Sequence, residues 1–105
     1  MIYIYIKSKM SNYQITCYCY NCNGNNDDTK SGESAKANYT AACHPNKYTA
    51  LKDKKIYIKD VGYRWIKDVY KKTLPENIID VYVGNTGPCK CSGNDINGVR
   101  EVTFY

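Results

Sequence analysis

The chain has 105 residues and a formal net charge of +5, which is the size of one domain, since independent domains usually need about 100–150 residues. Strong helix formers are scarce, because Leu occurs twice, Glu three times and Gln once. Val, Ile, Tyr, Thr, Phe and Trp together supply 37 residues, and these types fit a pleated, half-buried surface. The composition excludes a helical bundle and predicts an all-β domain. No stretch approaches the roughly 18 apolar residues of a membrane-spanning helix.

In chain order, residues 1–12 are predicted to form an N-terminal extension, either a strand or a flexible segment, and residues 13–105 a single domain. The opening Met1–Ile6 alternates as a strand would. Asn- and Gly-rich stretches at 21–38 and 84–98 predict two long surface loops. Short strands separated by turn signals indicate a sandwich or a barrel. They are predicted at 13–20, 39–43, 55–59, 63–69, 78–83 and 100–105.

Positive charge is concentrated in the middle of the chain. Residues 47–72 hold nine Lys and Arg against three Asp. A basic face favours anionic partners such as nucleic acid, teichoic acid or cell-wall carboxylates. The plainer interpretation is a solvated strand face that binds no partner.

Six cysteines invite three interpretations. In a small domain poor in Leu and Phe, disulfides would stabilise the fold by about 2–4 kcal/mol each, so we predict a disulfide framework, with no metal and no other cofactor. The rival is a zinc site in which Cys19-x-x-Cys22 and Cys89-x-Cys91 supply four thiolates. We disfavour it because residues two apart on a strand share a face but lie far from each other. Free thiols are the third possibility. The disulfide candidates are Cys17, Cys19, Cys22, Cys43, Cys89 and Cys91, and sequence cannot choose their connectivity.

Two acidic residues stand out by position. Asp68 ends a predicted strand, and Asp80 lies inside the apolar run 78–83. Desolvation raises the pKa of such a carboxyl unless it is hydrogen-bonded. A carboxyl with a raised pKa is what a general acid needs to protonate a glycosidic oxygen. The alternative is that Asp80 faces solvent or caps a backbone group on the polar side of its strand.

The order of the segments over residues 13–105 resembles the 3D domain. This domain is named for three aspartates and is shared by the membrane-bound lytic transglycosylase A family, cell-wall proteins of Gram-positive bacteria and many phage proteins. The matching segments are Thr16-Cys17-Tyr18-Cys19 with Cys22 and Gly24, Thr29-Lys30-Ser31-Gly32, Ala42-Cys43-His44-Pro45, Lys55-Ile56-Tyr57-Ile58, Gly62-Tyr63 with Asp68, 77–83 and 97–102.

The resemblance implies a six-stranded double-psi β-barrel with a surface groove. In the transglycosylases, the aspartate at the Asp80 position acts first as the acid and then as the base, and the one at the Asp68 position shapes its electrostatics. The position of the family's first aspartate is occupied here by His44, which the resemblance places beside the substrate. Tyr63, Trp65 and Tyr82 could line the groove as sugar-stacking platforms, although some of these are expected in the core.

These observations lead to one expected function and two alternatives. The expected function is lytic transglycosylase-like cleavage of peptidoglycan glycan strands by a monomeric extracellular or cell-wall-associated barrel. The first alternative is a non-catalytic barrel that binds the cell wall or a protein. It is favoured by Tyr70-Lys71, which stand where the family's turn after the aspartate has two glycines. The second alternative, supported only by the Lys-rich middle and its interleaved Tyr, is a basic nucleic-acid-binding module.

Overall fold

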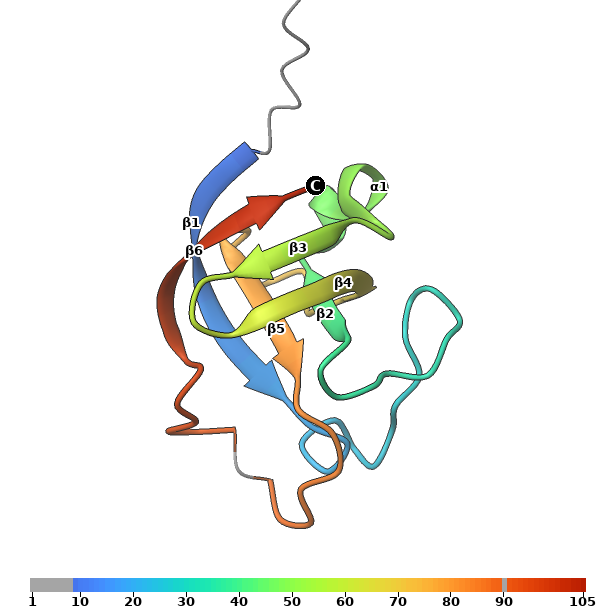
Figure 1. Ribbon diagram of the computed structural model, residues 1–105. Coiled ribbons are helices and arrows are strands. Elements are labelled where there is room, and N and C mark those ends of the chain that lie inside the picture. Colours follow the sequence, from blue (N-terminus) through green and yellow to red (C-terminus); the bar gives the residue numbers. More distant parts are fainter. Residues whose placement is uncertain (1–8, 90) are drawn as a thin grey trace, which may run out of the picture.

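The computed structural model describes residues 9–89 and 91–105, and in these ranges six strands close into a barrel (Figure 1). The strands are β1 (Lys9–Tyr18), β2 (Thr40–Cys43), β3 (Lys55–Ile58), β4 (Gly62–Val69), β5 (Ile78–Tyr82) and β6 (Gly98–Phe104). Their order around the barrel is β1-β5-β2-β4-β3-β6. The predicted all-β, six-stranded barrel is confirmed.

The barrel is a mixed sheet. Two pairs of strands run parallel, β1 with β5 and β2 with β4. The other neighbouring strands, β2/β5, β3/β4, β3/β6 and β1/β6, are antiparallel. Parallel partners cannot be joined by a tight hairpin, so the two parallel pairs join segments that are distant in the sequence. This pairing agrees with the double-psi topology that the resemblance implies.

The core is built from aliphatic side chains at alternate strand positions, as the period of two along a β-strand requires. In β3, for example, Ile56 and Ile58 are buried while Lys55 and Tyr57 are exposed. Isoleucine and valine dominate, which explains how a chain with two leucines still closes a core. The side chains with no exposed surface include Ile15, Ile56, Ile58, Ile66, Ile79, Val81 and Val102.

A helix that the sequence did not predict follows β2. This helix, α1 (Pro45–Leu51), begins at His44, whose side chain accepts a hydrogen bond from the backbone N–H of Asn46. Pro45 suits the first helical turn, because its φ angle is fixed near the helical value and its missing N–H would be unpaired there anyway. Among the described residues, no helix has the length and apolar character that a membrane crossing requires.

The N-terminal strand starts earlier than its strongest sequence signal. Pairing of β1 with β6 extends back to Lys9, opposite Phe104, so residues 9–12 are part of the barrel wall. The predicted alternation of Met1–Ile6 lies outside the described residues.

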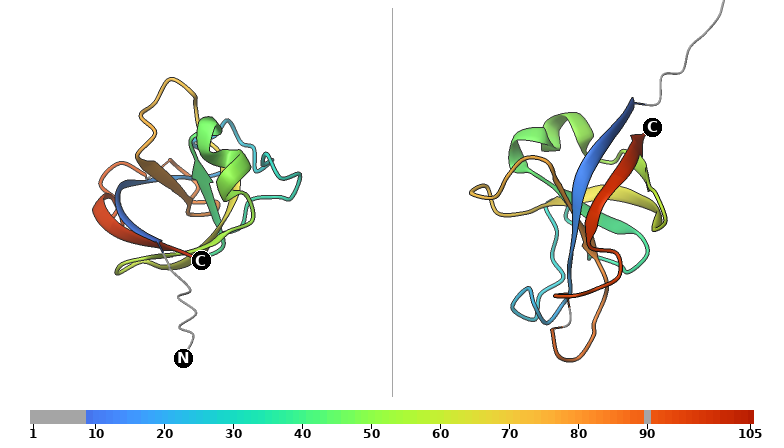
Figure 2. Two further views of the ribbon diagram at one scale, coloured as in Figure 1. Left: turned by 90° about the horizontal axis from the view of Figure 1, so that it is seen from above. Right: turned by 90° about the vertical axis from the view of Figure 1, so that its left-hand side faces the viewer.

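The two long loops lie together at the end of the barrel opposite α1 (Figures 1 and 2). Since β1 and β5 are parallel, the chain leaves both strands at the same end. The backbone N–H of Tyr20 donates to the carbonyl of Gly84 at 3.0 Å, and that of Val83 donates to Tyr18 at 2.8 Å. The start of each loop is therefore tied to the other.

Two valines of β6 test which face of this strand is turned toward the core. Val102 is fully buried and Val99 is 70% exposed. Val102→Ala should lower the free energy of unfolding by about 2 kcal/mol, because it removes buried methyl groups and leaves a cavity. Val99→Ala should change it by less than about 0.5 kcal/mol. Urea denaturation of both variants measures this, and equal losses would contradict the assignment of β6 faces.

Candidate functional site

Four strands carry one row of side chains across the outer face of the barrel. Asp80 on β5 is paired with Thr16 on β1 and with Ala42 on β2. Ala42 is paired in turn with Asp68 on β4. Directly paired residues project from the same face of a sheet, and the neighbours of Asp80 in β5, Ile79 and Val81, belong to the core. The row therefore faces outward, and the two aspartate Cα atoms are about 10 Å apart, which is two strand spacings.

A β-bulge places Asp68 in this row. Ala41 pairs with Ile66, but the next residue, Ala42, pairs with Asp68, so the register shifts and Lys67 is passed over. Ile66 is a core residue, and in a regular strand the residue two positions later would face the core as well. The bulge redirects Asp68 to the outer face, beside the methyl group of Ala42.

The Asp68 carboxyl group accepts three hydrogen bonds. Its Oδ1 accepts from the backbone N–H groups of Lys30 and Val69 at 3.0 and 2.9 Å. Its Oδ2 accepts from the hydroxyl of Tyr18 at 3.0 Å. Asp68 is only 9% exposed. Both oxygens act as acceptors, which is the bonding pattern of an ionised carboxylate.

Asp80 has a different environment. Burial raises the pKa of its carboxyl to about 6, the negative charge of Asp68 acts in the same direction, and the hydrogen bond from Thr16 opposes both. That bond joins Thr16 Oγ1 to Asp80 Oδ1 at 2.8 Å. A carboxyl that titrates near pH 6 can both release and recover a proton under mild conditions, as a general acid and base must.

The loop after β1 lies against this face. Besides the bond from Lys30 to Asp68, the backbone N–H of Ser31 donates to the carbonyl of Lys67 at 3.0 Å. Lys67 Nζ also forms an ion pair with Glu33 at 2.9 Å. Ala42, at the centre of the row, is 1% exposed although it points away from the core. The loop thus limits the access of water to the Asp68 end of the row.

Tyr82 and Tyr18 extend the row toward the long loops. The two residues are paired on β5 and β1, and their rings meet edge to face with centroids 5.1 Å apart. Tyr82 is 4% exposed and packs beside Tyr18 on the same face of the barrel. Thr16 and Tyr18 were not predicted as site residues, although the alternation along their strand places both on the outer face.

Trp65 and Tyr63 lie farther along β4, on its outer face. Trp65 does not belong to the buried core and stacks on Tyr39 at a centroid distance of 5.0 Å. Tyr63 is 46% exposed, and Lys55 Nζ lies 4.4 Å from its ring centroid. Tyr63 is five residues before Asp68, or about 15 Å along an extended strand. These rings therefore form a surface beside the carboxyl row and do not touch it.

His44 is a structural residue in this fold. It is 3% exposed, and its Nδ1 accepts from the backbone of Asn46 at 3.0 Å. Its Nε2 lies 3.0 Å from the carbonyl oxygen of Lys72, so this nitrogen must carry the proton and donate it. Both ring nitrogens are used within the protein.

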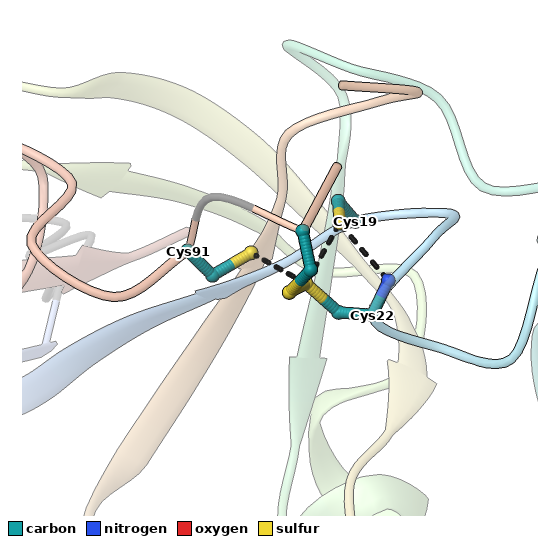
Figure 3. Close-up of side chains that lie close together, drawn as sticks. Cys19, Cys22 and Cys91 are labelled. Carbon is teal, nitrogen blue, oxygen red and sulfur yellow. Dashed lines mark hydrogen bonds between the residues drawn. A yellow bond between two sulfur atoms is a disulfide. The ribbon is translucent and has the colours of Figure 1, made fainter. Parts of the chain in front are cut away.

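The cysteines fall into a cluster and two separate residues. Cys22 and Cys89 form a disulfide, which confirms disulfide bonding for one pair. The Sγ of Cys19 lies 2.8 Å from that of Cys22, and Cys91 Sγ lies 3.4 Å from it (Figure 3). Cys43 is a free thiol in the core. Cys17 is free and donates to the carbonyl of Cys91.

The expected strand geometry of Cys89 and Cys91, which disfavoured a zinc site, is wrong. Both residues lie in the loop between β5 and β6. In that loop their Sγ atoms join those of Cys19 and Cys22, all within 4.8 Å of one another. Among the described residues, these are the side chains grouped closely enough to hold a metal ion.

A surface pocket lies elsewhere on the barrel. A pocket of about 570 Å³ is bordered by α1 and the β1/β6 edge, with Tyr13, Lys47, Leu51 and Phe104 among its lining residues. Neither Asp80 nor Asp68 lines it. The pocket and the carboxyl row thus lie at different places. The raised pKa of Asp80 makes the row the better candidate site.

No protein-family model matches the sequence, and no curated protein matches it significantly. A closed six-stranded barrel does not by itself identify a family or a function. The resemblance to the 3D domain therefore remains an interpretation of the motifs, and function must be argued from the carboxyl row.

The raised pKa of Asp80 predicts a pH dependence of stability. Its folded-state pKa of about 6 lies above the ordinary aspartate value of 3.8, so the folded protein binds the proton more tightly than the unfolded chain. The resulting stability is complete below about pH 4 and is lost as the pH rises to about 6. Asp80→Asn removes this dependence, so the difference in unfolding free energy between variant and wild type should change by up to about 3 kcal/mol across that window.

Urea denaturation between pH 4 and pH 7 measures this difference. NMR titration of the Asp80 carboxyl in variants of two neighbouring residues provides two controls, in which its pKa should shift in opposite directions. Thr16→Val should raise its pKa further, because a hydrogen bond to the charged form is lost, and Asp68→Asn should lower it, because a neighbouring negative charge is removed. Shifts of the same sign in both variants would refute this account of the site.

Proposed function

We propose that this protein is a peptidoglycan-directed barrel that cleaves the glycan strand in a lytic transglycosylase-like reaction, with Asp80 as its acid and base. One observation carries the proposal: the half-buried carboxyl of Asp80, with a pKa of about 6, shares an outer row with the hydrogen-bonded carboxylate of Asp68. Glycoside-cleaving sites typically contain two carboxyl groups to which different environments give different pKa values.

The proposed reaction uses one carboxyl group twice. Protonated Asp80 donates its proton to the glycosidic oxygen as the bond from that oxygen to the muramyl carbon breaks. The Asp80 carboxylate then accepts the proton of a muramyl hydroxyl, whose oxygen closes an anhydro ring on the same carbon. Asp80 ends the cycle protonated, and water is not consumed. Hydrolysing glycosidases, by contrast, use a pair of carboxyl groups.

The neighbours of Asp80 would have positioning and electrostatic roles. Asp68 is held by Tyr18 and by two backbone N–H groups, so its charge has a fixed place in the row. That charge favours the protonated form of Asp80, which is the form needed for the first step. Thr16 orients the carboxyl through its hydrogen bond to Oδ1.

The outer surface of β4 supports binding of the glycan strand. Tyr63 and the half-buried Trp65 offer ring faces on which sugars stack. Lys55 lies over both rings, 4.4 Å from the Tyr63 centroid and 5.8 Å from that of Trp65. An ammonium group at this place suits the carboxylates of the peptide stems. A cell-wall substrate would place the protein outside the cell or in the wall.

The central test is Asp80→Asn, which keeps the shape of the side chain and an oxygen that accepts from Thr16. The variant should fold and bind purified sacculi, yet release anhydro-muropeptides about 100- to 10,000-fold more slowly, the contribution of general acid–base catalysis. Asp68→Asn should be slower than wild type but faster than Asp80→Asn. Wild-type activity should fall as the pH rises above about 6, because Asp80 must begin protonated. Mass spectrometry of the released fragments gives all three rates.

Asp60→Asn is the matched control. Asp60 is a surface residue whose side chain is 75% exposed, and its replacement should leave the activity unchanged. If wild-type protein binds sacculi and releases nothing, the catalytic proposal fails and the non-catalytic binding barrel replaces it. Salt-dependent retention on single-stranded nucleic acid, without retention on sacculi, would overturn both in favour of a nucleic-acid-binding module.

A further inference from the structure

Four cysteines from two loops converge at the end of the barrel. Cys19 and Cys22 follow β1, and Cys89 and Cys91 follow β5. Their Sγ atoms all lie within 4.8 Å of one another. Figure 3 shows the sulfur atoms of Cys19, Cys22 and Cys91 turned toward the same point. A single disulfide uses two of these sulfurs and leaves the other two thiols packed against it.

The spacing of the four sulfur atoms fits a tetrahedral metal ion. A Zn–S bond of about 2.3 Å in a tetrahedral site implies sulfur atoms about 3.8 Å apart. Apart from the bonded pair Cys22 and Cys89, the distances within the cluster bracket this value, from 2.8 Å between Cys19 and Cys22 to the 4.8 Å limit that holds for all pairs. Side-chain rotations, without rearrangement of the barrel, would equalise them.

The backbone around Cys19 is arranged as it is around a metal-bound thiolate. The N–H of Cys22 donates to Cys19 Sγ at 3.1 Å, and the N–H of Asn23 donates to the Cys19 carbonyl at 3.0 Å. A tight turn thus brings the two sulfurs of Cys19-x-x-Cys22 together. Hydrogen bonds to ligating atoms fix their orientation and tune the site. Cys19 has no exposed surface, so this sulfur is shielded from solvent on the barrel side.

We propose that in the reduced chain Cys19, Cys22, Cys89 and Cys91 bind one Zn²⁺ as a closed structural site, and that the Cys22–Cys89 disulfide is the oxidised alternative of the same cluster. Reduction of the disulfide by a small thiol or phosphine takes two electrons and two protons and yields two thiols. Zinc then displaces the thiol protons as the four thiolates bind. Thiolate ligands select zinc over the hard cations Mg²⁺ and Ca²⁺, and four protein ligands leave no position for substrate.

Such a site would hold together the end of the barrel that carries the candidate active site. The loops leave β1 and β5 directly after the paired Tyr18 and Tyr82, and the same two strands carry Thr16 and Asp80. The loop after β1 then continues over the carboxyl row to Lys30 and Ser31. Metal binding adds its free energy to folding, and the inference does not depend on whether the barrel cleaves glycan.

The test is metal binding by the full chain under anaerobic, reducing conditions. Reduced wild-type protein should bind one Co²⁺ with the strong visible absorption typical of tetrahedral thiolate coordination, and one Zn²⁺ should displace it. Zinc should also raise the melting temperature of the reduced protein. The same protein with the disulfide intact should show neither effect, because only two thiolates of the cluster remain.

Single substitutions distinguish the ligands from the other cysteines. Cys19→Ser and Cys91→Ser should lose the stoichiometric Co²⁺ absorption, whereas Cys17→Ser and Cys43→Ala, which alter thiols outside the cluster, should keep it. Far-UV circular dichroism of each reduced variant shows whether it is folded. If a ligand variant does not fold, the comparison of reduced and oxidised wild type decides alone. Absence of Co²⁺ uptake by reduced wild type, or its loss in Cys17→Ser, would overturn the assignment.

Discussion

The register of β2 between β5 and β4 is the constraint on which the rest of the structure depends. Ala42 is paired on one side with Asp80 and on the other with Asp68. A slip of β2 by one residue would turn its core residues Ala41 and Cys43 outward and Ala42 toward the core. Burial of these core positions therefore fixes Ala42 as the residue between the two carboxyl groups. The bulge at Lys67 adjusts β4 to this requirement, so that a core strand also presents an acid on its outer face.

The two aspartates share one face but differ in how their charges are satisfied. Asp68 receives three hydrogen bonds, two of them from backbone groups that the fold holds in place. Asp80 receives one, from Thr16, and is otherwise desolvated. An unpaired buried charge is costly, so the fold favours the proton on Asp80. Polar contacts thus stabilise the carboxylate of Asp68. Asp80 has no comparable set of contacts and is available for proton transfer.

The parallel pairing of β1 and β5 has a consequence at the end of the barrel. Because both strands end there, two long loops begin side by side and can be cross-linked over a short distance. All four cysteines of the cluster lie in these loops. The loops begin directly after Tyr18 and Tyr82, and Tyr18 donates its hydroxyl to Asp68. One strand end thus lies between the cysteine cluster and the carboxyl row.

The sequence by itself determined the secondary structure and the chemistry available to this protein. Alternating Ile and Val specify strands and their inner faces, Asn and Gly specify the loops, and the strand bounds are accurate to within two residues except at the start of β1. The carboxyl of Asp80 inside an apolar strand was a local signal of a perturbed group. Helix α1 was not predicted, because its cap depends on His44. The ring of His44 is hydrogen-bonded to the backbone carbonyl of Lys72, a residue distant in the chain.

Only the tertiary structure decided which of these residues meet. Asp68 reaches the row through a bulge that depends on pairing with β2, and Tyr18 reaches Asp68 across two intervening strands. The cysteines meet because parallel strands more than sixty residues apart end together. Local pattern fixes the direction of each side chain along its own strand. It contains no information on strand order around the barrel, which is set by burying every apolar face at once.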